Sequence, residues 1–518
     1  MPVKPPNILI VMVDQLAPAF LPFHGHKVVK APHLEALAGN GVVFERAYCA
    51  SPLCSPSRAS FMSGLAPSRT GVYDNAAEFS ADIPTFAHHL RLIGYRTILS
   101  GKMHFCGPDQ LHGFEQRLTT DIYPADYGWT PDWDHPLERP SWYHNMRSVT
   151  EAGLCVRTNQ LDFDDEVVFA AKRAIFDFAR AKEARPFLLV ASFTHPHDPF
   201  AIPERYWGLY RDADIDMPGP PVPADKLDPH SLRLRRVCAM DAEPVTDQNI
   251  RDARRAYYGA ISYVDDNLGE LVAALRDSGL DRDTIVIFAG DHGEMLGERG
   301  LWFKMSFFEG AARVPLLVCA PERYAPRRVA ASVSLLDVLP TLVDLAGRDS
   351  AALGSTIDGR SLVPQLEGRG GHDEAIGEYL AEGAIAPMVM IRRRAHKFIH
   401  SPPDPDQLYD LAADPGERDN LAARPEEAER VADFRREAAR RWNLPALEAK
   451  VRASQRRRRL VDAALRKGEI HSWDFQPLRD AAKLYVRNAM PLDDIEAMAR
   501  FPRLAPRRSD AEGGGSAG

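Results

Sequence analysis

The sequence predicts an α/β protein with a doubly wound, mostly parallel sheet, a smaller C-terminal antiparallel α+β subdomain and an extended C-terminal tail. Continuous apolar runs rich in β-branched residues, such as 7–13 and 283–290, are typical of strands buried on both faces. These runs alternate with helical stretches along the first 371 residues. From about residue 372 the pattern changes to short strands and turns, which indicates a second, smaller unit.

Length and composition bound the function. A chain of 518 residues can bury a large core. The net charge of −8 and pI of about 6.1 give no reason to expect nucleic acid or a membrane as a partner. Six cysteines without a repeating spacing favour reduced thiols over a disulfide framework. Residues 7–14 are too short to span a bilayer and no cleavage site follows, so we expect a cytoplasmic protein.

The elements of the first unit follow in order. The expected strands share a continuous apolar character and are 7–13, 42–48, 96–101, 186–193, 283–290 and 314–319. The expected helices show amphipathic spacing and are 32–41, 83–92, 164–181, 252–277 and 334–346. The aromatic-rich stretch 105–158 is a long loop over the sheet edge, where function is usually carried. We therefore predict a catalytic domain over residues 1–371.

The C-terminal part is predicted as a small subdomain, 372–446, and a helical oligomerisation tail with a disordered end, 447–518. Short strands are expected at 388–392 and 397–400, and a helical region interrupted at Pro445 follows. The arginine run 456–459 is interpreted as a solvated face or a subunit contact. The tail carries apolar residues such as Trp473 and Tyr485, which is more apolar surface than a free tail should expose to water. This favours a homo-oligomer, either a dimer or a homotetramer.

Cys54 lies in Ser51-Pro-Leu-Cys-Ser-Pro-Ser-Arg58, which reads as a loop entering a helix. The free N–H groups of a helix start favour an anion, and Arg58 adds a charged fork suited to tetrahedral oxyanions. A lone cysteine here has two interpretations from chemistry alone. It is a half-buried structural thiol or a thiolate nucleophile.

Polar residues follow the predicted strands where each one ends. Asp14-Gln15, Lys102/His104, His197 and Asp291-His292 come after four separate strands, and Cys54 and Lys304 lie on adjoining loops. Because ligands of parallel sheets bind beyond the carboxyl ends of the strands, we expect these groups to converge at one edge. The sequence therefore predicts an active site there.

The Cys-x-Pro-Ser-Arg motif together with this set resembles the formylglycine sulfatases of the alkaline phosphatase superfamily, through essentially the whole chain. In that family the cysteine is oxidised to formylglycine by a maturation enzyme. The resemblance implies a divalent metal held by Asp14, Gln15, Asp291, His292 and the modified Cys54. Oxygen ligands suit calcium, whereas the softer His292 keeps manganese as an alternative, and magnesium is a third possibility.

The resemblance also implies a mechanism. A hydroxyl of the formylglycine hydrate attacks sulfur, while the sulfate oxygens are held by Arg58, Lys102, His197 and Lys304. His197 or Lys304 protonates the leaving group, and His104 takes the proton from the second hydroxyl. The product is inorganic sulfate.

Longer blocks, including Gly-Pro-Asp-Gln-Leu-His-Gly-Phe114 and Gly-Glu-Arg-Gly-Leu-Trp-Phe-Lys304, are similar to those of the choline sulfatases within that family. This resemblance implies hydrolysis of choline-O-sulfate. The implied substrate-binding residues are Asn75, Trp129, His144, Asn145 and Glu382, with Asp493 reaching in from a neighbouring subunit. One departure is the stretch 383–385, Gly-Ala-Ile, where an aromatic residue would be expected.

Two alternatives come from other functions. A phosphonate monoester or phosphodiester hydrolase of the same superfamily would share the Asp-Gln and Asp-His pattern. A catalytically silent choline-ester-binding protein would keep Cys54 as an unmodified thiol. Neither accounts for the full set of blocks as well as a sulfatase does, because a binding protein needs neither His104 nor a nucleophile.

Overall fold

The computed structural model describes residues 5–181, 185–242, 244–354, 356–469 and 492–500. The expectations for Trp473, Tyr485 and the glycine-rich end lie outside these ranges. Within the described residues, the main sheet has eight strands in the order β10-β2-β9-β8-β1-β6-β3-β4. Only β9 runs antiparallel to its neighbours β2 and β8. The predicted mostly parallel α/β fold is confirmed.

The strands of the main sheet have the following bounds: β1 Asn7–Val13, β2 Val42–Tyr48, β3 Arg96–Gly101, β4 Gln116–Arg117, β6 Phe187–Ser192, β8 Thr284–Gly290, β9 Arg313–Cys319 and β10 Arg327–Ser334. The central strand β1 is buried along its whole length, which explains its unbroken apolar sequence. The short edge strand β4 and the half-exposed β10 were not predicted, because neither carries a continuous apolar run.

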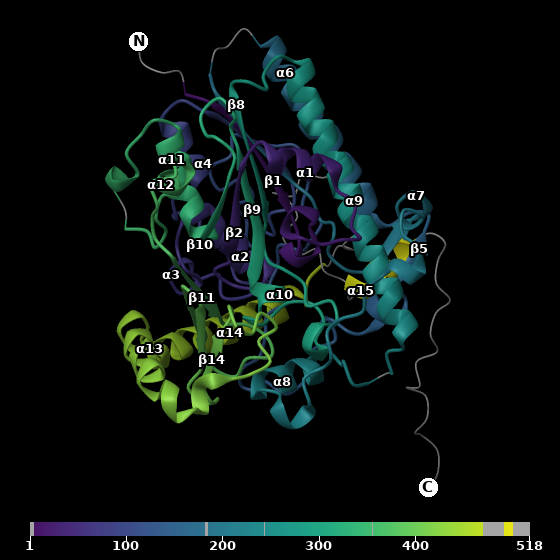
Figure 1. The fold of residues 1–518 in the computed structure, drawn as a ribbon, viewed down its shortest axis with the longest axis vertical. Helices are drawn as coiled ribbons and strands as arrows, with labels where there is room; N and C mark the ends of the chain where they lie inside the picture. The colour runs from purple at the N-terminus through teal and green to yellow at the C-terminus, as the bar shows by residue number, and fades with distance from the viewer. Residues whose placement is uncertain (1–4, 182–184, 243, 355, 470–491, 501–518) are drawn as a thin grey trace.

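Helices cover both faces of the main sheet (Figure 1). On one side lie α1 (Pro32–Gly39), α6 (Asn159–Arg180) and α9 (Asp247–Asp277), and on the other α4 (Phe86–Leu92) and α11 (Val338–Leu345). Two helices begin five residues before their predicted starts. Thr158 caps α6 by accepting from the Leu161 N–H, and Thr246 caps α9 in the same way. Their polar first turns carry caps rather than the apolar spacing on which the prediction depended.

Shorter elements connect these layers. They are β5 Gly153–Cys155 and β7 Ala201–Pro203, which pair in parallel, and the helices α2 Cys54–Ser63, α3 Pro67–Thr70, α5 Arg147–Thr150, α7 Glu204–Trp207, α8 Pro229–Val237, α10 Glu309–Ala312 and α12 Val363–Leu366. All six cysteines are buried and free, in agreement with the expected reduced thiols.

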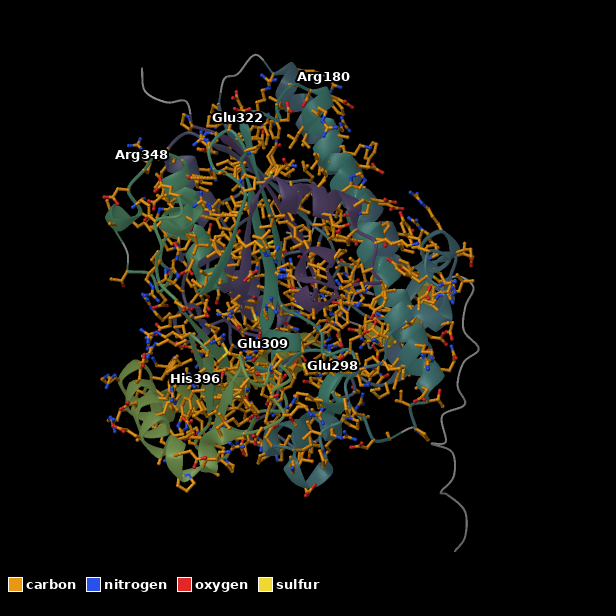
Figure 2. All side chains as sticks on the ribbon, in the orientation of Figure 1. Arg180, Glu298, Glu309, Glu322, Arg348 and His396 are labelled. Atoms are coloured by element: carbon orange, nitrogen blue, oxygen red, sulfur yellow. The ribbon has the colours of Figure 1, made fainter. Side chains whose placement is uncertain are left out.

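The C-terminal unit is a small antiparallel sheet in the order β11-β12-β13-β14, with bounds Glu374–Tyr379, Met388–Arg393, His396–His400 and Gln407–Asp410. It packs on α13 (Ala428–Arg441) through a core of its own that includes Phe398 and Phe434. A buried ion pair joins this sheet to the main domain, because Lys397 on β13 lies 2.6 Å from Glu309. Figure 2 shows Glu309 near the junction of the two units.

A second C-terminal helix, α14 (Leu444–Leu465), begins where the sequence predicted a break, with Pro445 in its first turn. The interpretation of its arginine run as a solvated face is wrong for Arg458, which is buried and binds Asp74 through two bonds of 2.7 Å. Arg456 binds Asp134 near the surface. The run therefore fastens α14 to the catalytic domain.

The last described helix, α15 (Leu492–Ala499), lies against the catalytic domain of its own chain. Among the described residues, no helix combines the length and apolar character needed to cross a bilayer.

Candidate active site

Cys54 is held at the start of α2, beyond the carboxyl end of β2. The Asn75 side chain accepts a hydrogen bond of 3.0 Å from the Ser55 N–H and so occupies one of the free donors of the helix start. The helix is buried throughout, and the Cys54 side chain is 1% exposed. The motif predicted from sequence is thus a loop-to-helix junction at the sheet edge.

Four predicted metal ligands converge at this point, because the carboxyl ends of β1, β2 and β8 lie at the same edge of the sheet. One ligand atom each of Asp14, Cys54, Asp291 and His292 lies within 4.8 Å of the others. The Cys54 Sγ is 3.2 Å from His292 Nε2 and 3.7 Å from Asp14 Oδ1.

The two carboxylates each present one oxygen to the cluster and give the other to a cation. Asp14 Oδ2 forms ion pairs with Lys102 and Arg58. Asp291 Oδ2 accepts a hydrogen bond of 2.7 Å from Arg58. Although burial opposes ionisation, the Lys102 charge and then the other cations hold the pKa of Asp14 well below its usual range. Asp14 is therefore arranged to act as a charged oxygen ligand, and Asp291 presents its Oδ1 to the same cluster.

His292 is oriented as a metal ligand. Its Nδ1 lies 3.0 Å from the Gly293 carbonyl oxygen, to which it donates, so Nε2 faces the cluster without a proton. Burial lowers the pKa of His292, which keeps the ring neutral. Two carboxylate oxygens and one neutral imidazole fit a divalent cation such as Ca²⁺ or Mn²⁺.

Gln15 adopts a left-handed backbone, with φ 61°, at the end of β1. Its amide oxygen accepts a hydrogen bond of 2.5 Å from Lys304, and its amide nitrogen donates to Asp198 at 3.1 Å and to Glu294. The structure therefore places Gln15 beside the metal cluster with its side chain engaged by protein groups.

Arg58 lies behind the cluster, away from the pocket. Its guanidinium is fully buried and also donates to the Lys102 carbonyl at 2.6 Å and to Ser192 Oγ at 2.8 Å. Its charged partners are the carboxylates of Asp14 and Asp291, and the expected contact with sulfate stays a prediction. Lys102 lies close to the cysteine, with its Nζ 3.7 Å from Cys54 Sγ.

Lys304 and His197 form a hydrogen-bonded pair at the pocket wall, with Lys304 Nζ 2.7 Å from His197 Nε2. His197 Nδ1 is 2.6 Å from the Asp198 carbonyl oxygen, so that nitrogen carries the ring proton. Burial and then Lys304 hold the pKa of His197 well below its usual value. Burial opposes the Lys304 charge, but Cys54 and Asp198 raise its pKa. The proton of the pair therefore resides on Lys304.

His104 follows β3 and faces the same pocket. Its ring packs beside Tyr123 and Trp129, and neither ring nitrogen has a hydrogen-bond partner among the described residues. Burial, and then the Lys102 charge, lower the pKa of His104 to about 3. A neutral imidazole with a free nitrogen can accept a proton from a group bound in the pocket.

An inner pocket connects these groups to the predicted substrate-binding residues. It is lined by Cys54, Asn75, His104, Tyr123, Trp129, Trp142, Tyr143, His144, His197, Asp198, Lys304, Glu382, Asp493 and Glu496. The indoles of Trp129 and Trp142 stack with centroids 6.3 Å apart. His144 stacks on Phe303. The pocket thus has a cationic floor at Lys304 and an aromatic wall.

Carboxyl groups also line the inner pocket. Burial raises the pKa of Glu382 to about 8 and that of Asp493 to about 7. The Asn145 side chain donates a hydrogen bond to Asp493. The prediction assigned Asp493 to a neighbouring subunit. In this single chain, α15 brings the chain's own Asp493 to the pocket.

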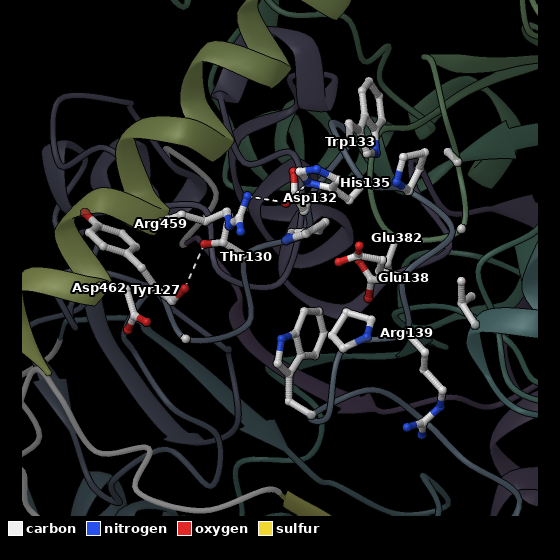
Figure 3. Close-up of a pocket in the computed structure, with 18 of the residues that line it drawn as sticks. Tyr127, Thr130, Asp132, Trp133, His135, Glu138, Arg139, Glu382, Arg459 and Asp462 are labelled. Atoms are coloured by element: carbon white, nitrogen blue, oxygen red, sulfur yellow. Dashed lines mark hydrogen bonds and ion pairs between the residues drawn. The ribbon is translucent and has the colours of Figure 1, made fainter.

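A larger outer cavity, of about 390 Å³, adjoins the inner pocket at Trp142 and Glu382. Figure 3 shows Glu382 and Glu138 facing this cavity, with Arg459 bound to Asp132 on its far side. Gly383 and Ala384 also line it. The stretch where an aromatic side chain was expected thus contributes small residues to the cavity wall.

Sequence reasoning missed several residues of this site. Asp198 binds Gln15 and Ser148, Tyr123 faces His197, and Glu496 lines the pocket next to Asp493. Asp198 directly follows His197, and Glu496 is one helical turn after Asp493, so their spacing could have indicated them. Tyr123 carried no comparable signal.

Comparison with known proteins agrees with this geometry. The model of the family described as "Sulfatase" matches residues 6–348, that of "N-sulphoglucosamine sulphohydrolase, C-terminal" matches 297–442, and that of "Choline sulfatase enzyme C terminal" matches 449–501. The chain therefore belongs to the sulfatase family, within the alkaline phosphatase superfamily, and is a sulfuric ester hydrolase.

The more particular similarity is to the choline-sulfatase of Rhizobium meliloti (strain 1021). It is 49% identical over 96% of this chain and 99% of that protein. Human iduronate 2-sulfatase is 31% identical, over 70% of this chain and 69% of that protein.

Among solved structures, the phosphonate monoester hydrolase of Agrobacterium radiobacter superposes with a TM-score of 0.67 at 27% identity. The match covers 86% of this chain and 96% of that one.

Proposed function

We propose that the protein hydrolyses choline-O-sulfate to choline and inorganic sulfate. The observation that carries this proposal is the mixed lining of the inner pocket, in which Cys54 and Lys304 line the inner pocket alone, whereas Trp142 and Glu382 also line the outer cavity. A sulfate group fits beside Cys54 and Lys304, and a quaternary ammonium fits beside the aromatic and acidic residues. Cation–π contact with the indole is worth about 0.5–2 kcal/mol. The similarity to a choline-sulfatase supports the same assignment.

The nucleophile is a hydroxyl of the hydrated aldehyde made from Cys54. The unmodified thiol is a poor nucleophile here, because burial and then the Asp14 carboxylate raise the pKa of Cys54 to about 12. A maturation enzyme that generates formylglycine is therefore a partner of the protein. Conversion replaces the sulfur by oxygen and makes the chain lighter.

A divalent metal completes the site, held by Asp14, Asp291, His292 and residue 54, with Gln15 beside them. When bound, the cation supplies positive charge that acidifies the nucleophile and stabilises the oxyanion. Arg58 pairs with both carboxylates and Lys102 with Asp14, which holds these ligands in place.

Proton transfers are divided between the two sides of the pocket. Lys304 donates a proton to the departing alkoxide of choline, and neutral His197 fixes the ammonium group by accepting its hydrogen bond. His104 takes the proton of the second hydroxyl at position 54 as the bond to sulfate breaks. The aldehyde is then restored.

The test is release of sulfate from choline-O-sulfate by the purified protein, with and without EDTA. Intact mass reports conversion of Cys54 in the same sample. Loss of turnover on chelation and recovery on adding Ca²⁺ or Mn²⁺ are expected. A protein that carries the aldehyde but releases no sulfate from choline-O-sulfate would contradict the proposal.

A second candidate function is hydrolysis of phosphonate monoesters, favoured by the similarity to the Agrobacterium radiobacter enzyme. The relative kcat/KM for a phosphonate ester and a sulfate ester of the same alcohol separates the two. A silent binding protein is the third possibility, and an unmodified Cys54 thiol in a protein that binds choline without turnover would identify it.

A further inference from the structure

Glu496 is a second acidic residue that α15 brings to the inner pocket. It follows Asp493 by three positions, so both side chains lie on the same face of the helix. Glu496 is 4% exposed and lines the same pocket as Cys54 and Glu382. Its Oε1 has no hydrogen-bond partner among the described residues. A buried oxygen of this kind costs free energy unless something in the pocket satisfies it.

The position of Glu496 is fixed by contacts on either side of it along α15. Asn145 holds Asp493 at one end. At the other end, the Arg500 guanidinium donates to the Glu151 carbonyl at 2.7 Å and to the Leu154 carbonyl at 2.9 Å. The helix is thus fastened to the catalytic domain before and after Glu496, which keeps this carboxyl directed at the pocket.

We propose that Glu496 is a specificity-determining residue for the leaving group. With Glu382 and Asp493 it forms a site of three carboxyl groups that selects sulfate esters whose leaving group carries a permanent positive charge. This inference rests on the proposed function and adds the residue that the sequence did not indicate. The stacked indoles of Trp129 and Trp142 face the same space, so a quaternary ammonium would meet carboxylates and aromatic faces together.

The charges around Glu496 agree with a cationic ligand. Burial, followed by Asp493 and Asp198, raises the pKa of Glu496 well above its usual value, against the opposing charges of Lys102 and Lys304. Without a cation beside it, the carboxyl therefore holds its proton to a higher pH than an ordinary glutamate does. A bound quaternary ammonium favours the ionised form, so cation binding is coupled to proton release.

The experiment compares Glu496→Gln with a control, Asp494→Asn. Asp494 is on the same helix, is exposed, lies 3.5 Å from Arg147 and does not line the inner pocket. Glutamine keeps the shape of Glu496 and removes its charge. Each protein is assayed with choline-O-sulfate and with 4-nitrophenyl sulfate, and its binding of tetramethylammonium is measured by calorimetry in two buffers of different ionisation enthalpy.

We expect Glu496→Gln to raise KM for choline-O-sulfate and the Kd for tetramethylammonium roughly tenfold, equivalent to about 1.4 kcal/mol. KM for the aryl ester should stay within about twofold, and proton release on cation binding should fall. Asp494→Asn should change none of these. Cation binding and proton release equal to those of the wild type would overturn the inference, as would equal losses on both esters.

Failure of the proposed function gives a different result. A wild type that hydrolyses the aryl sulfate but not choline-O-sulfate contradicts the choline assignment, and tetramethylammonium binding still tests Glu496 in that case.

Discussion

Lys304 Nζ lies 2.7 Å from His197 Nε2, with the proton of the pair on the lysine. In the proposed mechanism the two residues have different parts in protonating the leaving group. Lys304 would supply the proton, and His197 would position it. The loss of activity on replacing either residue should therefore depend on how strongly the leaving group of the substrate needs a proton.

Replacing Lys304 by alanine should reduce kcat for choline-O-sulfate by roughly 100-fold or more, because an alkoxide is a poor leaving group without general acid catalysis. For 4-nitrophenyl sulfate, whose leaving group is stable as an anion, the loss should be much smaller. Steady-state kinetics with both esters measure the difference. Equal losses would mean that Lys304 only binds the sulfate.

His197→Gln should preserve part of the activity that His197→Ala loses, because the glutamine carbonyl can still accept the Lys304 hydrogen bond. The pH profile of kcat with choline-O-sulfate is the decisive reading, since loss of the acceptor changes the environment of the Lys304 proton. Two variants with identical rates and profiles would argue against a positioning role.

Cys54→Ala should abolish turnover of every sulfate ester, since no nucleophile remains at the head of the pocket. The fold should survive, because the residue lies at a loop-to-helix junction beyond the sheet. Circular dichroism and thermal unfolding check the fold, and sulfate release checks activity. Cys54→Ser, which has one hydroxyl instead of two, should accumulate a trapped sulfate ester that intact mass reveals. Near wild-type activity in either variant would refute the mechanism.

Affinity for choline-O-sulfate should rise with pH. The pKa of Glu382 is raised to about 8 and that of Asp493 to about 7, so both carboxyls are protonated at low pH and ionise as the pH increases. Ionised carboxylates attract the ammonium group, and KM should therefore fall between about pH 6 and about pH 8.5. KM for a neutral aryl sulfate, measured in the same buffers, should lack this trend. A flat choline-O-sulfate profile would contradict the assignment.

Arg458→Ala should destabilise the protein by about 3 kcal/mol, because it leaves the Asp74 carboxylate buried without its charge partner. Arg459→Ala is the matched control. It breaks an ion pair with Asp132 on the same helix, but the Arg459 side chain is 48% exposed, so the expected cost is below about 1 kcal/mol. Urea unfolding monitored by tryptophan fluorescence measures both. Equal losses would show that burial of the pair contributes little.

Deleting residues 471–518 should weaken choline-O-sulfate binding, because it removes α15 with Asp493 and Glu496, while aryl sulfate hydrolysis survives in part. We also expect the truncated protein to form a looser oligomer. The deleted segment carries the apolar residues Trp473 and Tyr485, on which the prediction of an oligomer depends. Light scattering and KM measurements check both. A truncated protein that stays oligomeric and keeps its KM would contradict the prediction.

The sequence by itself determined the fold class and most of the central strands. Runs such as 7–13 and 284–290 are apolar throughout because both faces of those strands are buried, and this information is local. The polar residues after each strand could be assigned to one edge, because parallel strands all end at the same edge of their sheet. Asp14, Cys54 and Asp291 then meet because the carboxyl ends of parallel strands meet.

Only the tertiary structure decided what each polar group faces. Arg58 follows Cys54 by four residues in sequence, yet its guanidinium contacts the carboxylates of Asp14 and Asp291. The sequence predicted that Arg458 belongs to a solvated run. The structure instead pairs it with buried Asp74, which lies far away in the chain. Glu496 reaches the pocket because α15 packs across it, and no local pattern specifies where a short acidic helix docks. Burial and long-range pairing are properties of the assembled fold, and the periodicity of a segment does not encode them.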